Sequence, residues 1–162
     1  MPMEFSREVM RRAKEEARDR CIDVAMAETP AAIRYVVPRR SLTGRAYEDH
    51  IEAPRPFTRK ALYVYLHEVA HVALGHFHGR RPRHLEEYEA EQWAHKRMRA
   101  HGIPVPCAMT QRAKRYVAWK IDQAKRRGAK KIDPGARRFS GVAARGWRTG
   151  GRNNDAAQGE VC

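Results

Sequence analysis

The sequence predicts a small α+β protein of one domain, mostly helical, with a short β-sheet ahead of its central helix. Apolar residues recur with the 3.6-residue period of an α-helix in four long segments. Only the stretch between about residues 33 and 53 has the β-branched and aromatic content that strands favour. At 162 residues and without an internal repeat, the chain is long enough for one modest core.

The N-terminal part is expected to be a helix from Ser6 to about Ala27, which ends before Thr29-Pro30 because a residue before proline avoids helical backbone angles. A strand is expected from Ile33 to Val37, stopped by Pro38, and one or two short strands between Gly44 and Ala53. The apolar edge of the first helix is formed by Val9, Met10, Ala13, Ala17 and Cys21.

The central helix is expected to begin after Thr58, a good N-cap residue, and to end at Leu74-Gly75, since glycine commonly follows a helix. Its pentapeptide His67-Glu68-Val69-Ala70-His71 lies beside the buried stripe. Residues four apart share a face of a helix, so His67 and His71 can offer two imidazoles to one metal ion. Glu68 is placed to act as a general base on water at that metal. The stripe itself consists of Leu62, Tyr65, Leu66, Val69 and Ala73.

A catalytic zinc site needs a third protein ligand. The next helix, expected from Leu85 to about His101, carries two glutamates and two alanines on one stripe. Carboxylates on a packing face are costly unless they are paired or bind a metal, which favours Glu87 as the third ligand. Glu91 is then expected to orient one of the histidines. His76 and His78, just past the central helix, are the alternative ligands. The stripe comprises Glu87, Ala90, Glu91, Ala94 and Met98.

The two helices together resemble the ImmA/IrrE family of zinc metallopeptidases. Proteins of that family carry an H-E-x-x-H helix followed by a helix with an E-x-E-A-N-x-F-A-like motif; the matching segments here are Leu66–His71 and Glu87–Ala94. The resemblance covers roughly the middle third of the chain and implies that Glu87 is the third zinc ligand. Glu91 stands where the family has asparagine, a spacing similar to that of thermolysin-like enzymes. By analogy, the resemblance to this family implies a zincin-like fold in which an edge strand holds an extended substrate peptide.

These residues predict a zinc-dependent endopeptidase that hydrolyses a peptide bond in a protein substrate, for which a DNA-bound regulator is an attractive target. Glu68 would take a proton from the attacking water and pass it to the leaving amine. The oxyanion-stabilising residue stays open among Tyr63, His76, His78 and Tyr116. One alternative is a nucleic-acid-binding or regulatory protein with a structural or inactive zincin-like metal site. The other is a SprT-like protease that uses a histidine as third ligand.

The net charge of +14 is concentrated near the C-terminus. Between Gln111 and Arg152, fourteen Lys or Arg stand against two Asp, a balance of +12. The first part of this basic stretch is expected to belong to a helix from Thr110 to Arg127, which packs through its apolar side and presents a basic face to solvent. We expect one domain over residues 1–133 and a basic, flexible tail over 134–162. Such a tract suits non-specific contact with nucleic acid, with a solvated cationic surface as the alternative.

No apolar run is long enough to cross a bilayer, and residues 4–20 are charged throughout, so neither a membrane partner nor a secretory signal is expected. Cys21, Cys107 and Cys162 are odd in number and far apart, which favours a reducing compartment. The expected location is therefore the cytoplasm. The sequence does not predict an oligomeric state.

Overall fold

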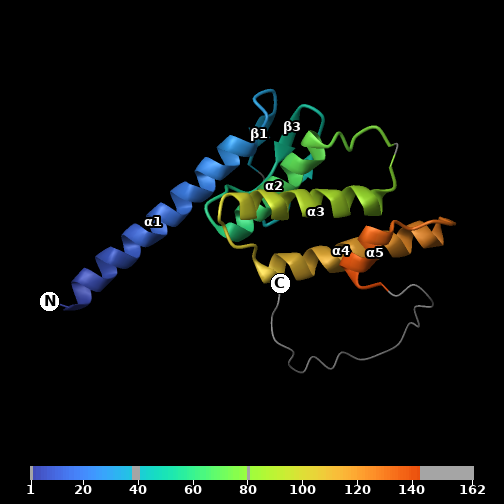
Figure 1. Cartoon of the computed structure of the whole chain (residues 1–162). Coiled ribbons are helices and arrows are strands. Elements are labelled where there is room, and N and C mark those ends of the chain that lie inside the picture. Colours follow the sequence, from blue (N-terminus) through green and yellow to red (C-terminus); the bar gives the residue numbers. More distant parts are fainter. Residues whose placement is uncertain (1, 38–40, 80, 143–162) are drawn as a thin grey trace, which may run out of the picture.

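The computed structural model describes residues 2–37, 41–79 and 81–142, with side chains from residue 6 onward. The predicted α+β class is confirmed, with a small sheet directly ahead of the H-E-x-x-H helix (Figure 1). Within these residues, no helix has the length and apolar content to cross a membrane. The elements, in chain order, are α1 (Pro2–Glu28), β1 (Arg34–Val36), β2 (Arg45–Ala46), β3 (His50–Glu52), α2 (Arg59–Ala73), α3 (Arg83–Ala100), α4 (Cys107–Arg126) and α5 (Pro134–Ser140).

The sheet has the order β1-β3-β2, with β1 parallel to β3 and β2 antiparallel to it. Ile51 of β3 pairs with Tyr35 on one side and with Ala46 on the other, and its side chain is fully buried. Tyr35 packs against Tyr65 of α2 with 5.0 Å between ring centroids. The sheet therefore covers one side of α2, and β2 is an edge strand that packs on that helix.

Helix α1 belongs to the core only at its C-terminal end. The earlier turns extend beyond the rest of the molecule (Figure 1). Val9 and Met10, expected on an apolar edge, are 49% and 57% exposed. Ion pairs between side chains three or four residues apart, such as Arg11 and Glu8 at 2.8 Å, support these exposed turns. The residues of α1 that are buried against the main core are Cys21, Val24 and Ala25.

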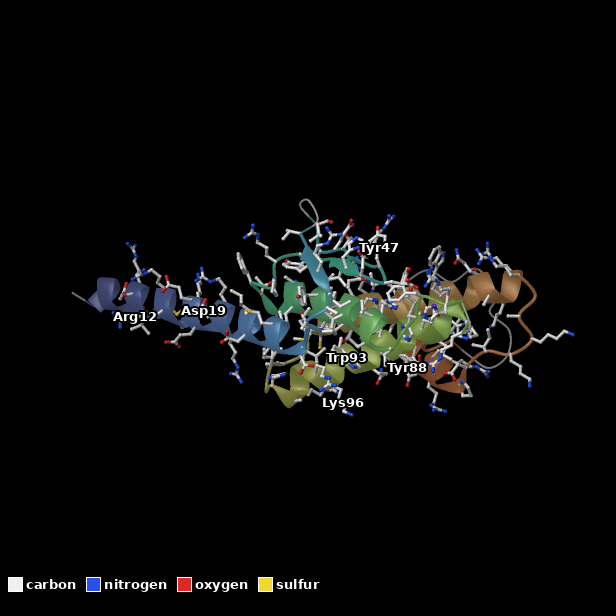
Figure 2. The ribbon with its side chains drawn as sticks, turned by 90° about the horizontal axis from the view of Figure 1, so that it is seen from above. Arg12, Asp19, Tyr47, Tyr88, Trp93 and Lys96 are labelled. Carbon is white, nitrogen blue, oxygen red and sulfur yellow. The ribbon has the colours of Figure 1, made fainter. Side chains whose placement is uncertain are left out.

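Helices α2 and α3 pack against each other and form the centre of the molecule (Figure 1). Ala90 and Ala94 of α3 are fully buried, and their small side chains let the two helices approach closely. Figure 2 shows α3, which carries Trp93, on the side of the molecule opposite the sheet. Glu87 and Glu91, each 6% exposed, share the buried stripe with the alanines. The packing face predicted on α3, including its two carboxylates, is confirmed.

Helix α4 has the predicted arrangement, because its apolar side is buried and its basic residues face outward. Ala113, Val117 and Ile121 are each 5% exposed or less. The helix ends at Arg126 and is followed by Gly128, whose φ of 86° is readily adopted only by glycine. The predicted limits, Thr110 to Arg127, are therefore close to the observed ones.

The expected boundary between the domain and a flexible tail at residue 134 is wrong for the first residues of that tail. They form α5, whose Ala136 is fully buried against α4. Asp133 caps this helix by accepting a hydrogen bond from the N–H of Ala136 at 2.8 Å, and Pro134 occupies its first turn. The Asp-Pro pair is thus a helix start signal within a Gly/Arg-rich composition that predicts disorder. The remainder, residues 143–162, lies outside the described residues.

Replacing Ile121 with alanine tests the docking of α4. Ile121 is 1% exposed in the cluster that joins α4 and α5. Ile121→Ala should therefore lower the free energy of unfolding by about 2–5 kcal/mol, because it leaves a cavity. Lys125→Ala, at an exposed position of the same helix, should change it by less than about 0.5 kcal/mol. Urea unfolding followed by circular dichroism measures both; equal effects would mean that α4 is not docked.

Candidate metal centre

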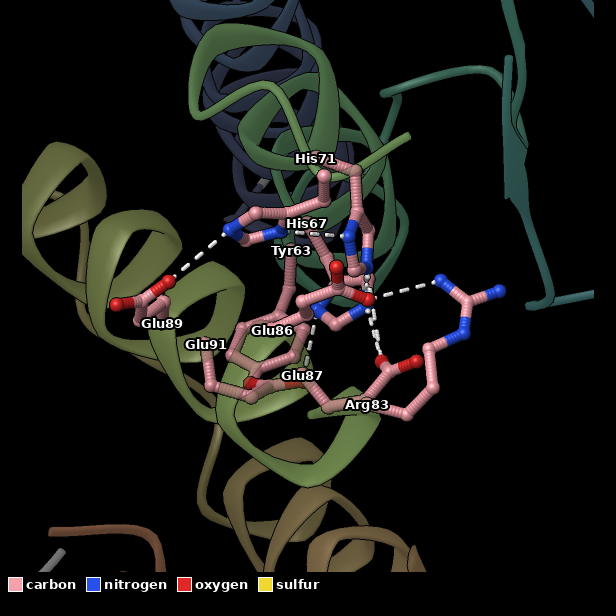
Figure 3. A network of polar contacts seen from close by, with 9 residues as sticks. Tyr63, His67, His71, Arg83, Glu86, Glu87, Glu89 and Glu91 are labelled. Carbon is pink, nitrogen blue, oxygen red and sulfur yellow. Dashed lines mark hydrogen bonds and ion pairs between the residues drawn. The ribbon is translucent and has the colours of Figure 1, made fainter. Parts of the chain in front are cut away.

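The two histidines of the pentapeptide point from α2 toward Glu87 on α3 (Figure 3). The Nε2 atoms of His67 and His71 are 3.1 Å apart. Oε2 of Glu87 lies 3.3 Å from His67 Nε2 and 3.5 Å from His71 Nε2. The three residues predicted as metal ligands therefore form a nearly equilateral triangle of donor atoms that is close enough to hold a metal ion.

Glu87 is a buried anion whose nearest polar partners are the two histidines. Burial alone would raise the pKa of its carboxyl group, but His67 and His71 outweigh burial and hold the pKa well below its usual range. A buried charge is stable only where opposite charge or hydrogen bonds compensate for lost water. The position between the three donor atoms is therefore one where a cation would be stabilised.

Nδ1 of His67, the ring nitrogen outside the triangle, faces Glu91, which the sequence predicts to orient one of the two histidines. His67 Nδ1 lies 2.9 Å from Oε1 of Glu91, within ion-pair distance although out of line for a hydrogen bond. Tyr63 donates its hydroxyl hydrogen to the other oxygen of Glu91, and its oxygen lies 3.1 Å from Nε2 of His95. Burial raises the pKa of Glu91 to about 8, an effect that Arg112 partly offsets. Glu91, on α3, is thus fixed behind His67 by contacts with two residues of α2.

Nδ1 of His71, the ring nitrogen outside the triangle, faces His76. The sequence does not predict this contact. Gly75 has a φ of 67°, and the N–H of His76 bonds to the carbonyl oxygen of His71 at 3.0 Å. This is the Schellman arrangement at a helix C-terminus, and it returns the chain alongside the last turn. The Nδ1 atoms of His71 and His76 are consequently 2.9 Å apart. Nε2 of His76 lies 3.1 Å from Oε2 of Glu89, which Arg81 also contacts at 2.5 Å.

One set of tautomers satisfies this whole chain of contacts. If His71 presents the lone pair of Nε2 to a metal, its Nδ1 carries the hydrogen and donates it to Nδ1 of His76. His76 then carries its own hydrogen on Nε2 and donates it to Glu89. Burial and His71 lower the pKa of His76, which favours the neutral ring that this arrangement requires. His76 therefore orients His71 and is not part of the donor triangle. The signal for this in the sequence is a histidine directly after the terminal glycine.

Glu68 lies beside the triangle, under the chain that leads into β2. A Cβ atom at Gly44 would lie 2.5 Å from Cγ of Glu68 and 2.6 Å from its Oε1, so any larger residue there would displace the Glu68 side chain. Burial raises the pKa of Glu68 to about 7; His71 opposes this effect and Glu87 reinforces it. A carboxyl group with a pKa near neutrality can both accept and return a proton. The close approach of Gly44 joins segments far apart in the sequence and carries no local signal.

A cleft of about 800 Å³ opens over the donor triangle. One wall is formed by residues 42–47, which include β2, and the other by the first half of α4. Arg112 of α4 donates a hydrogen bond to the carbonyl oxygen of Leu42 at 2.8 Å and so connects the two walls. The cleft thus brings the edge strand, Glu68 and the donor triangle into one space.

The four candidates for an oxyanion-stabilising residue are separated by their contacts. The hydroxyl of Tyr63 is engaged by Glu91, and His76 is engaged by His71. His78 is exposed, with Nδ1 at 3.7 Å from Glu48. Tyr116 lines the cleft from α4 and is 41% exposed. Its pKa is raised to about 12 by burial and by the negative charges of Glu87 and Glu68, against the effect of Arg83. Tyr116 is therefore the candidate that faces the open cleft.

No protein-family model matches this chain, and no match was found among curated proteins or among solved structures. The resemblance to the ImmA/IrrE family accordingly stays a prediction from the two motifs.

Zinc content tests the donor triangle. Glu87→Gln should lower zinc affinity by more than the roughly 10–100-fold that outer contacts usually contribute, because it removes the charged donor. His76→Ala should lose about 10–100-fold, and His78→Ala should match the unmodified protein. Elemental analysis and competition with a chelating dye measure this. A Glu87→Gln protein that retains full zinc, while His76→Ala or His78→Ala is empty, would mean that a histidine is the third ligand.

The burial of His95 predicts a pH dependence of stability. Burial, aided by Arg99 and Lys114, lowers the pKa of His95 to about 4. In the unfolded chain this histidine has an ordinary pKa near 6.5, so as the pH falls the unfolded chain binds a proton before the folded protein does. The stability that the neutral, buried ring contributes is therefore fully present above about pH 6.5 and is lost as the pH falls toward 4. In zinc-free protein, His95→Gln should remove about 1–2 kcal/mol of the stability difference between pH 7.5 and pH 5. Urea unfolding at both values measures it, with His78→Gln as control; an unchanged difference in His95→Gln would contradict a buried, neutral His95.

Proposed function

We propose that this protein is a zinc-dependent endopeptidase. The observation that carries the proposal is the donor triangle of His67, His71 and Glu87 with Glu68 beside it in the same cleft. Ligand atoms of a tetrahedral zinc with bonds of about 2.0–2.1 Å lie about 3.3–3.4 Å apart. The observed separations of 3.1, 3.3 and 3.5 Å support that geometry. Three protein ligands also leave a fourth position for water or substrate, as in catalytic zinc sites.

The residues around the triangle have distinct roles in this proposal. A bound zinc ion supplies Lewis acidity, which lowers the pKa of water to about 7 and polarises a carbonyl group. Glu68 accepts the proton of the attacking water and returns it to the leaving amine, a role that its pKa of about 7 suits. Tyr116, on the opposite wall, donates its hydroxyl hydrogen to the oxyanion that develops on the substrate. Glu91 and His76 keep the two imidazoles in place.

The edge strand β2 is the proposed binding surface for the substrate backbone. β2 pairs with β3 on one side, and it forms part of the cleft wall. An extended peptide that adds to such an edge gains backbone hydrogen bonds and lies across the metal position. This arrangement supports a zincin-like fold, and a protein that is itself bound to DNA is the proposed substrate.

The identity of the third donor supports an ImmA/IrrE-like enzyme over a SprT-like one. A SprT-like site would need a third histidine at the triangle. In this protein Glu87 supplies the third donor atom of the triangle. His76 contacts Nδ1 of His71, outside the triangle, and His78 is exposed. The carboxylate therefore favours a gluzincin-type ligand set.

One observation favours the second candidate function, a regulatory protein with a structural or inactive metal site. Glu68 is 7% exposed and lies against Gly44, so little of its side chain is open to the cleft that it lines. The hydrogen bond from Arg112 to Leu42 holds the chain segment before Gly44 in place. A protein that binds zinc and never opens this segment would use the metal for stability alone.

Glu68→Gln separates the two candidates. Because Glu68 is not a donor of the triangle, the variant should retain zinc and fold while proteolysis falls by roughly 10²–10⁴-fold. Glu48→Gln, at an exposed carboxylate beyond the cleft, should cleave at the wild-type rate. Cleavage of unfractionated host proteins, followed by mass spectrometry of new termini, is the measurement. Wild-type cleavage by Glu68→Gln would exclude Glu68 as the base, and zinc-loaded wild type that cleaves nothing would favour the regulatory function.

A further inference from the structure

Helix α4 carries a second exposed surface next to the cleft. Tyr116 and Trp119 are 41% and 50% exposed, and their rings lie 5.7 Å apart at an interplanar angle of 30°. The opposite face of the same helix is buried. A large aromatic side chain left half in water on a docked helix is unfavourable in isolation, and paired aromatics of this kind are typical of binding sites.

The cations around this aromatic pair are arranged on the same face of α4. Positions 112, 115, 116 and 119 follow one another at helical spacing, so Arg112 and Arg115 are aligned with the two rings. Nζ of Lys120 lies 4.9 Å from the centroid of Trp119 and 5.1 Å from that of Tyr116. Among the described residues, no carboxylate forms an ion pair with Arg112, Arg115 or Lys120; the ion pair seen on α4 joins Arg126 and Asp122 at 2.8 Å. Arg112 also donates a hydrogen bond to the carbonyl oxygen of Leu42. The surface is therefore aromatic, and within the described part of the chain no ion pair neutralises its cations.

We propose that this surface of α4, formed by Arg112, Arg115, Tyr116, Trp119 and Lys120, binds single-stranded nucleic acid. The cations attract phosphate groups through counterion release. The exposed ring of Trp119 stacks on an unpaired base, which is the recurring element of sequence-independent single-strand sites. A duplex keeps its bases stacked on one another and cannot use the aromatic pair. The surface therefore discriminates by strandedness and not by sequence.

The position of this surface links it to the cleft without depending on the proposed peptidase activity. Arg112, Arg115 and Tyr116 also line the cleft wall, and Trp119 lies one turn farther along α4. A bound strand would run beside the cleft opening. Proteins carried on that strand would then be held close to β2 and Glu68.

Fluorescence anisotropy with a labelled oligo(dT) strand and with a hairpin duplex of the same charge tests the proposal. At low salt, the full-length chain should bind oligo(dT) more tightly than it binds the hairpin duplex. Trp119→Ala should weaken oligo(dT) binding by about 5- to 100-fold and leave the duplex affinity unchanged, because stacking is lost and charge is kept. Arg115→Ala should weaken both and reduce the salt slope by about 0.7 for the single strand. Phe57→Ala is the matched control, because Phe57 is 43% exposed and lies 5.9 Å from the guanidinium carbons of Arg18 and Arg55, and it should bind like wild type.

Zinc content and circular dichroism of each variant establish that the fold is intact, and the same titrations with Glu68→Gln should match wild type. Oligo(dT) affinity of Trp119→Ala within twofold of wild type would overturn the proposal. Equal affinity for strand and duplex, or no binding at low salt, would overturn it as well. Each of these outcomes is independent of whether the protein cleaves a substrate.

Discussion

The burial of two carboxylates between α2 and α3 is the constraint on which the site depends. Ala90 and Ala94 let the helices approach closely, and the same stripe takes Glu87 and Glu91 out of water. The negative charge of Glu87 in that position has to be compensated inside the protein, whereas burial favours the protonated form of Glu91 by raising its pKa to about 8. His67 provides a partner to each glutamate, 3.3 Å from one and 2.9 Å from the other. The donor triangle is thus the arrangement that makes this helix pair tolerable, and a cation at its centre would stabilise it further.

Separate contacts fix the two imidazoles, so that neither can rotate without breaking a buried interaction. Glu91 lies behind His67 and is held by Tyr63, while His76 lies behind His71 through the turn at Gly75. A metal site preorganised in this way loses little conformational entropy when an ion binds. The glycine that ends α2 therefore also helps to position His71, because it turns the chain so that His76 contacts that ring.

The features predicted from the sequence are those encoded by local spacing. The H-E-x-x-H helix and the packing stripe of α3 follow from residues four apart, and the structure has both. The sequence predicts that Glu91 orients one of the histidines, and the structure places it beside His67. Features that depend on contacts between distant segments did not follow. Gly44 meets Glu68 across the fold, and α5 docks against α4 in a stretch whose composition predicts disorder. The role of His76 could be predicted only in part. Gly75 before it indicates a turn at the helix end, but the contact of His76 with His71 is seen only in the folded structure.

The measurement that tests the account most directly is the location of zinc in crystals of the zinc-loaded protein, from anomalous scattering at the zinc edge. We predict a single peak within bonding distance of Nε2 of His67, Nε2 of His71 and Oε2 of Glu87, with His76 on the far side of His71. A peak bound by His76 or His78 in place of Glu87 would contradict it. So would a zinc-loaded structure in which Glu87 is turned away and the histidines face solvent.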